Sequence, residues 1–265
     1  MRFKIISSIS DKNRFLPVNY QYHISSWIYR RIGEADQQLA EFLHSQGYGE
    51  GNRRFKFFNF GHINLKPYRP HWDRGVFELL GQEVGITVSF FLPEIAESFV
   101  RGLFMNNEVF IGDRINGVRL RVKEMQVLPL PEFKETMSYR LISSCCVTRP
   151  PQEGETYGQY LGPEDKEFIP RLVDNLKTKF EAARNVPSYA GDFSDNTNID
   201  IQILSKEPKS KLVKVKELTK AATDIRGWVF DCKITAPVEV HEFIWSVGLG
   251  EKGSMGFGMV ELKKL

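Results

Sequence analysis

The chain has 265 residues, of which 42% are hydrophobic and 26% charged, with a net charge of +3 at pH 7. This composition is typical of a soluble globular protein with one large domain or two ordinary ones. No apolar run reaches the roughly 18 to 20 residues of a membrane span, and the start of the chain lacks a signal-peptide core. Three cysteines, two of them adjacent, make neither a disulfide framework nor a zinc pattern, which favours a reducing cytoplasm.

The first half of the chain predicts two helices near its start. After a strand at 2–9, the apolar residues of segment 20–32 share one helical face, and Tyr29 lies at the edge of that face. Asp36 is a suitable N-cap for a short second helix, whose last turn carries His44 pointing away from the buried side. We expect further strands at 53–60, 75–80, 83–92, 109–111 and 118–127, and a helix at 93–105.

The pattern starts again after residue 128. Segment 129–137 is proline-spaced and reads as a linker. Beyond it we expect strands at 139–148, 199–204, 211–215, 227–235 and 259–262, with helices at 165–184 and from Pro237 to Val247.

An internal match relates the two halves. At an offset of 144 residues, Pro93 aligns with Pro237 and Phe99 with Phe243, and both segments follow a strand and carry apolar residues at helical spacing. Each half therefore reads β-α-β-β-α-β. We predict an α+β protein with two tandem ferredoxin-like domains, at 1–128 and 138–265, although an α/β sandwich of another topology also fits the order of elements.

Five glycines fall within residues 248–258, which we call the glycine-rich loop. Glycines gather where the backbone needs positive φ or closely approaches a ligand. The first three match the dinucleotide-binding spacing, but that motif needs a strand before it and a helix after it, and here the order is reversed. The loop, with Lys252 and Ser254 at its tip, is suited to holding an anion or a phosphodiester backbone.

The spacing Gly248-Leu249-Gly250, five residues, then Gly256-Phe257-Gly258 resembles the G-h-G-x5-G-h-G loop (h, hydrophobic) of CRISPR-associated RAMP-superfamily endoribonucleases. Residues 250–258 are similar to the members that process repeat RNA. The start Met1-Arg2-Phe3, helix 20–29, His44 and segment 93–97 also look like that family.

This resemblance implies cleavage of precursor CRISPR RNA by its own 2′-OH, without metal or cofactor, leaving a 2′,3′-cyclic phosphate and a 5′-OH. Such chemistry needs a base, an acid and positive charge on the phosphate. The family's catalytic histidine and tyrosine positions fall on His44 and Tyr29. The third position falls within 53–56, where Lys56 is our candidate, and Arg53 or Arg54 could also fill the role.

Clustered basic residues, interleaved with aromatics, favour a nucleic-acid partner over plain solvated faces. In segment 211–216 we expect an apolar face opposite a row of lysines that faces phosphates. The expected RNA-binding residues are Arg53, Arg54, Arg119, Arg121, Lys211, Lys214, Lys216, Gly248, Gly250, Lys252, Ser254, Gly256 and Gly258.

The expected partner is CRISPR repeat RNA, and CRISPR effector-complex subunits or a second copy of the chain are compatible partners, whereas no membrane is expected. Two other functions stay open from the sequence. The chain could be a non-catalytic RNA-binding subunit of a CRISPR effector complex, or a nucleotide-binding module that uses the glycine-rich loop. The helix-before-strand order of that loop argues against the second.

Overall fold

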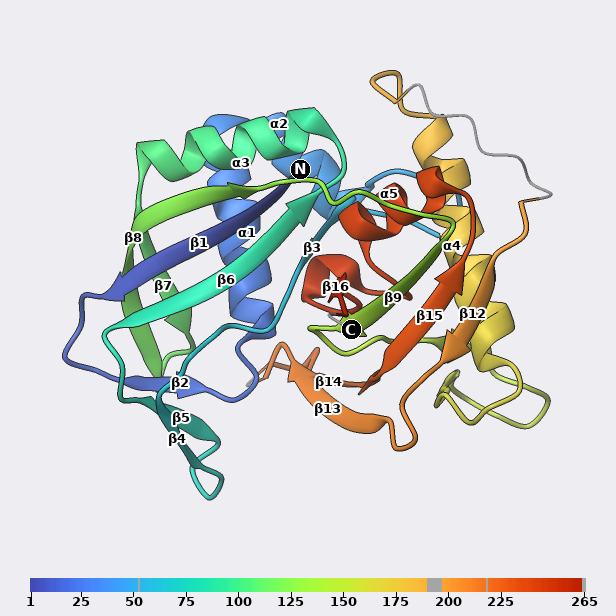
Figure 1. Cartoon of the computed structure of the whole chain (residues 1–265). Helices are drawn as coiled ribbons and strands as arrows, with labels where there is room; N and C mark the ends of the chain where they lie inside the picture. The colour runs from blue at the N-terminus through green and yellow to red at the C-terminus, as the bar shows by residue number, and fades with distance from the viewer. Residues whose placement is uncertain (52, 190–196, 218, 264–265) are drawn as a thin grey trace.

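A computed structural model describes residues 1–51, 53–189, 197–217 and 219–263. Its elements form two α+β domains that lie side by side (Figure 1). The helices are α1 (Gln21–Ala35), α2 (Gln37–Ser45), α3 (Pro93–Met105), α4 (Phe168–Arg184), α5 (Val238–Val247) and the short 3-10 helix η1 (Gly253–Met255). In the described ranges no helix is both long and apolar enough to cross a membrane.

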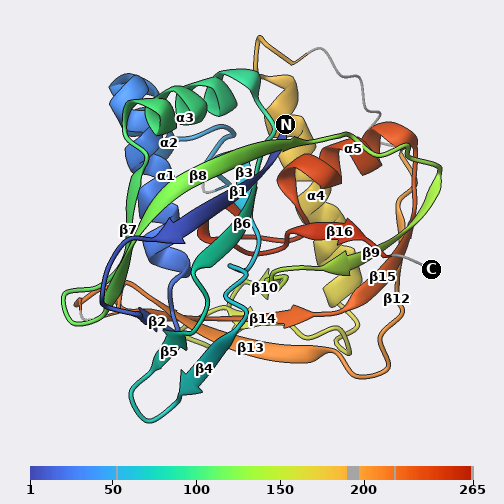
Figure 2. The ribbon, with the colours of Figure 1, turned by 60° about the vertical axis from the view of Figure 1, so that its left-hand side comes forward.

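The first domain is built on a five-stranded antiparallel sheet in the order β3-β6-β1-β8-β7. Helices α1 and α3 cover one face of this sheet (Figures 1 and 2). Aromatic rings pack between these layers. The ring centroid of Trp27 in α1 lies 5.5 Å from that of Phe99 in α3, and the Phe99 centroid lies 4.9 Å from that of Phe90 in the sheet. The strands are β1 (Arg2–Ile9), β3 (Phe58–Phe60), β6 (Glu83–Phe90), β7 (Glu108–Gly112) and β8 (Gly117–Leu128).

The second domain repeats this arrangement with a four-stranded antiparallel sheet in the order β12-β15-β9-β16. Its strands are β9 (Thr136–Leu141), β12 (Asp200–Ile203), β15 (Asp231–Thr235) and β16 (Val260–Leu262). Numbered by their place in each β-α-β-β-α-β unit, the strands of both sheets run 2-3-1-4, and β7 adds an edge to the first. The predicted pair of tandem ferredoxin-like domains is confirmed.

Three small sheets complete the structure, in the orders β2-β5-β4, β10-β11 and β13-β14. Their strands are β2 (Phe15–Pro17), β4 (Tyr68–His71), β5 (Val76–Leu79), β10 (Thr148–Arg149), β11 (Gln159–Tyr160), β13 (Lys209–Val215) and β14 (Thr223–Val229). The consecutive segments 75–80 and 83–92, which read as a strand pair, do not pair with each other, because β5 pairs with β2 and β4 whereas β6 pairs with β1 and β3.

Several predicted strands are shorter than expected. Segment 53–60 is a strand only from Phe58, because Phe57 has a left-handed φ of 52° that breaks the extended chain. Segment 139–148 leaves the sheet after Leu141. The backbone of its cysteines instead forms isolated antiparallel β-bridges, Cys145 with Trp228 and Cys146 with Glu251. Segment 227–235 is two strands, which belong to different sheets.

The expected row of lysines on segment 211–216 does not include Lys211, although Lys214 and Lys216 are exposed as expected. Alternate residues of a strand face opposite sides, so Lys211 shares its side with the buried Val213 and Val215. Lys214 lies on the other side together with Leu212, whose side chain is 50% exposed.

Arg2 joins the two domains. Its side chain is 3% exposed, lies 3.5 Å from the ring of Trp245, and donates to the carbonyl oxygens of Trp245 and, at 2.7 Å, of Val260. Ser89 adds a hydrogen bond of 2.9 Å to the Ser246 carbonyl. One continuous hydrophobic core runs through both domains, so they pack as a single body.

Candidate active site and RNA-binding cleft

Tyr29 of α1 and His44 in the last turn of α2 lie next to each other where the two helices pack together. Their ring centroids are 5.7 Å apart at an interplanar angle of 77°. Asp36 separates the helices and caps α2 as expected, accepting a hydrogen bond of 2.9 Å from the Leu39 amide. This cap fixes where α2 begins, so His44 falls in its last turn, exposed and beside Tyr29.

Lys56 completes a group of three. Its ammonium donates to the His44 carbonyl oxygen at 3.4 Å. The chain returns to this point through Gly47, whose φ is +68° and whose added Cβ would lie 2.8 Å from the Lys56 Nζ. Burial, and then the positive charge of Arg54, lowers the pKa of Lys56. Arg54 itself bonds the carbonyls of Gly49 and Gly51.

The Tyr29 hydroxyl stays protonated at neutral pH. Burial raises its pKa to about 12, and a hydrogen bond with the Ser254 side chain opposes that shift. Its ring packs edge-on against Phe58 at 5.3 Å. Tyr29 therefore has one face in the core and a hydroxyl that can donate a hydrogen bond at the surface.

The glycine-rich loop closes on itself at its two ends. The Leu249 amide donates to the Gly258 carbonyl oxygen at 2.8 Å, and a Cβ on Gly258 would lie 1.7 Å from the Leu249 oxygen. Gly258 also has a φ of +78°, so the position needs glycine on both counts. At the tip, the Ser25 hydroxyl donates to the Ser254 carbonyl at 2.7 Å, which holds the loop against α1.

A cleft of about 760 Å³ opens beside Lys56, between the two domains. Its basic lining residues are Arg53, Arg54 and Lys56 from the first domain and Arg149, Arg171, Lys179 and Lys252 from the second. The acidic ones are Asp174 and Glu251, and Asp174 forms an ion pair of 3.0 Å with Arg53 across the cleft. The excess of cations suits the cleft to a polyanion.

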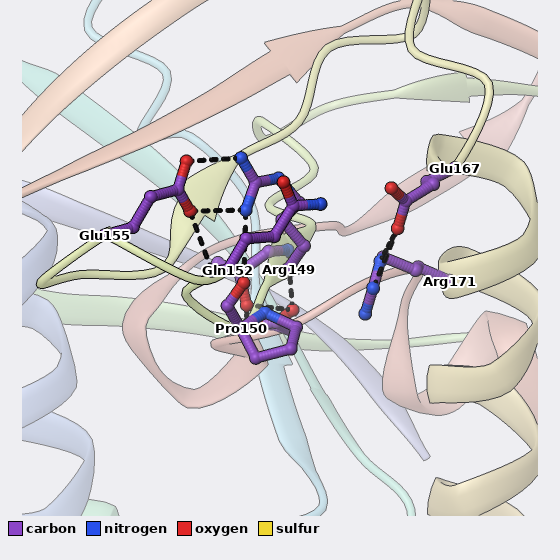
Figure 3. A network of polar contacts seen from close by, with 8 residues as sticks. Arg149, Pro150, Gln152, Glu155, Glu167 and Arg171 are labelled. Carbon is purple, nitrogen blue, oxygen red and sulfur yellow. Dashed lines mark hydrogen bonds and ion pairs between the residues drawn. The ribbon is translucent and has the colours of Figure 1, made fainter.

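The wall of the cleft in the second domain is held by ion pairs (Figure 3). Arg149 donates to both carboxylate oxygens of Glu155, at 2.6 and 2.8 Å, and the backbone N–H of Gln152 donates to the same carboxylate at 2.9 Å. The hydrogen bond from Arg149 is the main reason why the pKa of Glu155 falls to about 2. On α4, Arg171 pairs with Glu167 at 2.8 Å. These contacts give the wall a defined shape.

Other predicted RNA-binding residues lie outside this cleft. Arg119 and Arg121 of β8 line a separate hollow of about 460 Å³ next to Phe110, and Arg121 pairs with Glu108 at 3.0 Å. Lys211 lies 5.9 Å from the ring of Tyr20. The structure therefore brings Arg53, Arg54 and the loop tip to the candidate catalytic residues, but not the cations of β8 or β13.

The sequence reasoning missed Arg149, Arg171 and Lys179. Lys179 had a detectable signal, because it follows Leu172 and Leu176 at helical spacing and so falls on the apolar side of α4, where a lysine is unusual. The two arginines had none, since their place at the cleft depends on how the domains pack.

Two family models match the chain: "CRISPR associated protein Cas6, C-terminal" over residues 128–262, and "CRISPR-associated protein Cas6, N-terminal" over residues 15–126. The chain belongs to the Cas6 family. A curated Cas6 endoribonuclease of Pyrococcus furiosus is 30% identical, with 99% of this chain and 90% of that protein covered. The "CRISPR-associated endoribonuclease Cas6 1" of Methanocaldococcus jannaschii is 28% identical, with 95% and 89% covered.

The fold agrees with this assignment to Cas6. A solved structure described as a Cas6-related gene product from Pyrococcus furiosus superposes with a TM-score of 0.81 at 23% identity, covering 100% of this chain and 98% of that chain. The family models and the curated relatives confirm the resemblance to the repeat-processing RAMP family.

Proposed function

We propose that this Cas6-family protein is an endoribonuclease that cuts precursor CRISPR RNA within its repeats. The observation that carries the proposal is the meeting of Tyr29, His44 and Lys56 at the edge of a cation-lined cleft, with the glycine-rich loop against Tyr29. Two curated relatives are named CRISPR-associated endoribonucleases.

The proposed reaction needs no metal. His44 accepts the proton of the 2′-OH, whose oxygen then bonds to the adjacent phosphorus as the bond to the 5′ oxygen breaks. Tyr29, which keeps its proton at neutral pH, supplies the acid for the leaving 5′ oxygen. The Lys56 ammonium stabilises the charge that builds up on the phosphate. The products are a 2′,3′-cyclic phosphate and a 5′-OH.

Labelled repeat RNA, incubated with the protein in EDTA, tests this function. We expect His44→Ala to abolish cleavage while repeat binding persists, because the exposed imidazole contributes little to the fold. His71→Ala is the matched control, since His71 pairs with Glu78 at 3.0 Å on the β4–β5 hairpin, away from the cleft. Full activity of His44→Ala, or cleavage of RNA with a 2′-deoxy sugar at the cut site, contradicts the mechanism.

The same cleft also fits a non-catalytic subunit that binds repeat RNA within a CRISPR effector complex. Cations from both domains would hold the phosphates in either case. Tight binding of repeat RNA with no cleavage under any condition would favour this second function.

A further inference from the structure

Lys179 lies on the buried side of α4 and reaches the glycine-rich loop. Its side chain is 5% exposed, and its ammonium donates to the carbonyl oxygens of Gly248 at 3.2 Å and Gly250 at 2.5 Å. These carbonyls flank Leu249, whose own carbonyl accepts a weak hydrogen bond of 3.6 Å from the Cys145 thiol. The ammonium thus binds the start of the loop at two carbonyl oxygens that are two residues apart.

The surroundings of Lys179 leave these carbonyls as its main partners. Within the described residues, no carboxylate lies within 4.0 Å of the ammonium. Glu251 is a carboxylate whose charge acts on Lys179, and it already accepts hydrogen bonds of 2.8 Å from both the backbone amide and the hydroxyl of Thr148. Burial raises the pKa of the Cys145 thiol well above its usual value, so the thiol stays neutral. Charge-assisted bonds of this kind are roughly twice as strong as neutral ones.

The segment that Lys179 holds is continuous with the segment that touches Tyr29. Gly248 and Gly250 have φ of +72° and +70°, and a Cβ there would lie 2.5 Å from the carbonyl oxygens of Gly258 and Cys146 respectively, so both positions require glycine. Four residues beyond Gly250, the Ser254 carbonyl accepts a hydrogen bond of 2.7 Å from Ser25 of α1, and the Ser254 side chain lies close enough to influence the pKa of Tyr29. The loop is therefore gripped by α4 of one domain and by α1 of the other.

We propose that Lys179 is a positioning residue, which holds the glycine-rich loop in the position where Ser254 lies beside Tyr29 and the bound RNA. This inference rests on the proposed ribonuclease function. Lys179 does not touch the reacting atoms. It acts through the two carbonyls, and a loop freed from them would move Ser254 relative to α1.

The protonation of Lys179 gives this role a pH signature. Burial lowers its pKa to about 8, below the 10.5 of a free lysine. Above about pH 8 the ammonium becomes a neutral amine, and the charge-assisted bonds to the loop weaken. The fold itself gains stability over the same range, because the unfolded chain still binds the proton that the folded chain has lost. Activity and stability should therefore move in opposite directions.

Three variants test the proposal: Lys179→Met, Lys179→Arg, and Lys166→Met as a control at an exposed position just before α4. Single-turnover cleavage of repeat RNA should slow by about 10- to 100-fold in Lys179→Met and recover in Lys179→Arg. The wild-type rate should fall above about pH 8, and both Lys179 variants should lack this decline. Unchanged cleavage by Lys179→Met, or the same decline in all variants, would overturn the proposal.

Hydrogen–deuterium exchange of residues 248–258 provides a readout that does not depend on cleavage. We expect faster exchange in Lys179→Met than in wild type, with Lys166→Met unchanged. The wild type itself, compared at pH 7 and pH 9 after correction for intrinsic rates, should show the same loss of protection even if the variants fold poorly. If wild type never cuts RNA, the ribonuclease function fails. If exchange is unaltered, the positioning role fails independently.

Discussion

Tyr29 carries its function through a single atom, the hydroxyl at the boundary between core and cleft. The ring is fixed by Phe58 and His44, at 5.3 and 5.7 Å, so the hydroxyl has little freedom of position. The Ser254 side chain of the glycine-rich loop lies close enough to influence the pKa of this hydroxyl. The residue therefore links the packing of α1 directly to the place where RNA is expected.

We predict that Tyr29→Phe lowers the single-turnover cleavage rate by about 100-fold while repeat binding changes little. Because the Tyr29 pKa is raised to about 12, its hydroxyl remains protonated between pH 5 and 9. The pH–rate profile of the variant should thus have the same shape as that of the wild type over that range, with a cleavage rate that is lower by the same factor at every pH. Tyr48→Phe, nearby on the turn after α2, is the control. A changed profile would mean that Tyr29 titrates in the reaction.

The side on which a single side chain lies was predictable from sequence where it depends only on the helix that carries the residue. The phase of helix 20–32 placed Tyr29 at the edge of the apolar face, and the cap at Asp36 determined the turn that carries His44. Lys211 was not predictable in the same way, because segment 211–216 was treated as one row although residues 211 and 214 face opposite sides of a strand. Arg149 reaches the cleft only through domain packing, which no local pattern encodes.

At the scale of elements, the glycine-rich loop contains glycines that the backbone conformation requires and one, Gly253, that it does not require. Gly258 has positive φ and no room for a Cβ, as described above. Gly253, at the tip, has no unusual φ, and a Cβ there would stay at least 3.4 Å from its neighbours. The two positions differ in conformation although they belong to one motif.

We predict that Gly258→Ala lowers the free energy of unfolding by about 1–3 kcal/mol, because alanine is strained at that φ and contacts the Leu249 oxygen. Gly253→Ala should change it by less than about 0.5 kcal/mol. Urea denaturation followed by fluorescence measures both. Equal losses for the two variants would show that the loop tolerates neither change for a reason other than backbone conformation.

The elements around this loop were the hardest to predict. Segment 139–148 has the composition of one long strand, but its second part leaves the sheet to hydrogen-bond the loop: the Ser144 carbonyl accepts from Gly258, and Cys146 from Glu251. These partners lie more than 100 residues away. Periodicity reports whether a residue is buried, and Cys145 and Cys146 are buried, but it does not report which neighbour buries them.

At the scale of the whole molecule, the duplicated strand order was the most predictable property. The match between Pro93 and Pro237 reflects a repeated unit whose two sheets share the order 2-3-1-4. What the repeat does not specify is how the copies face each other. That depends on contacts such as those of Arg2 with Trp245, and of the His62 amide with the Ile142 carbonyl at 3.0 Å.

His62 makes this domain boundary sensitive to acid. Burial, with a smaller contribution from Lys211, lowers its pKa from 6.5 to about 3. Below pH 6.5 the unfolded chain takes up a proton that the folded chain resists, so stability falls as the pH decreases toward 3. We predict a loss of about 2 kcal/mol between pH 6.5 and 5 in wild type, and a flatter dependence in His62→Gln. Urea titrations at several pH values test this, and parallel curves for the two proteins would contradict it.

The contacts of Arg2 have a consequence for synthesis. Its carbonyl partners at Trp245 and Val260, like the glycine-rich loop that meets Tyr29, are translated more than 200 residues after the strand they stabilise. The strands of the first sheet, together with Tyr29 and His44, are already synthesised by residue 128. The cleft is lined as far along the chain as Ser254, so a product terminated before the glycine-rich loop would carry the proposed catalytic side chains without the complete cleft that is proposed to hold RNA against them.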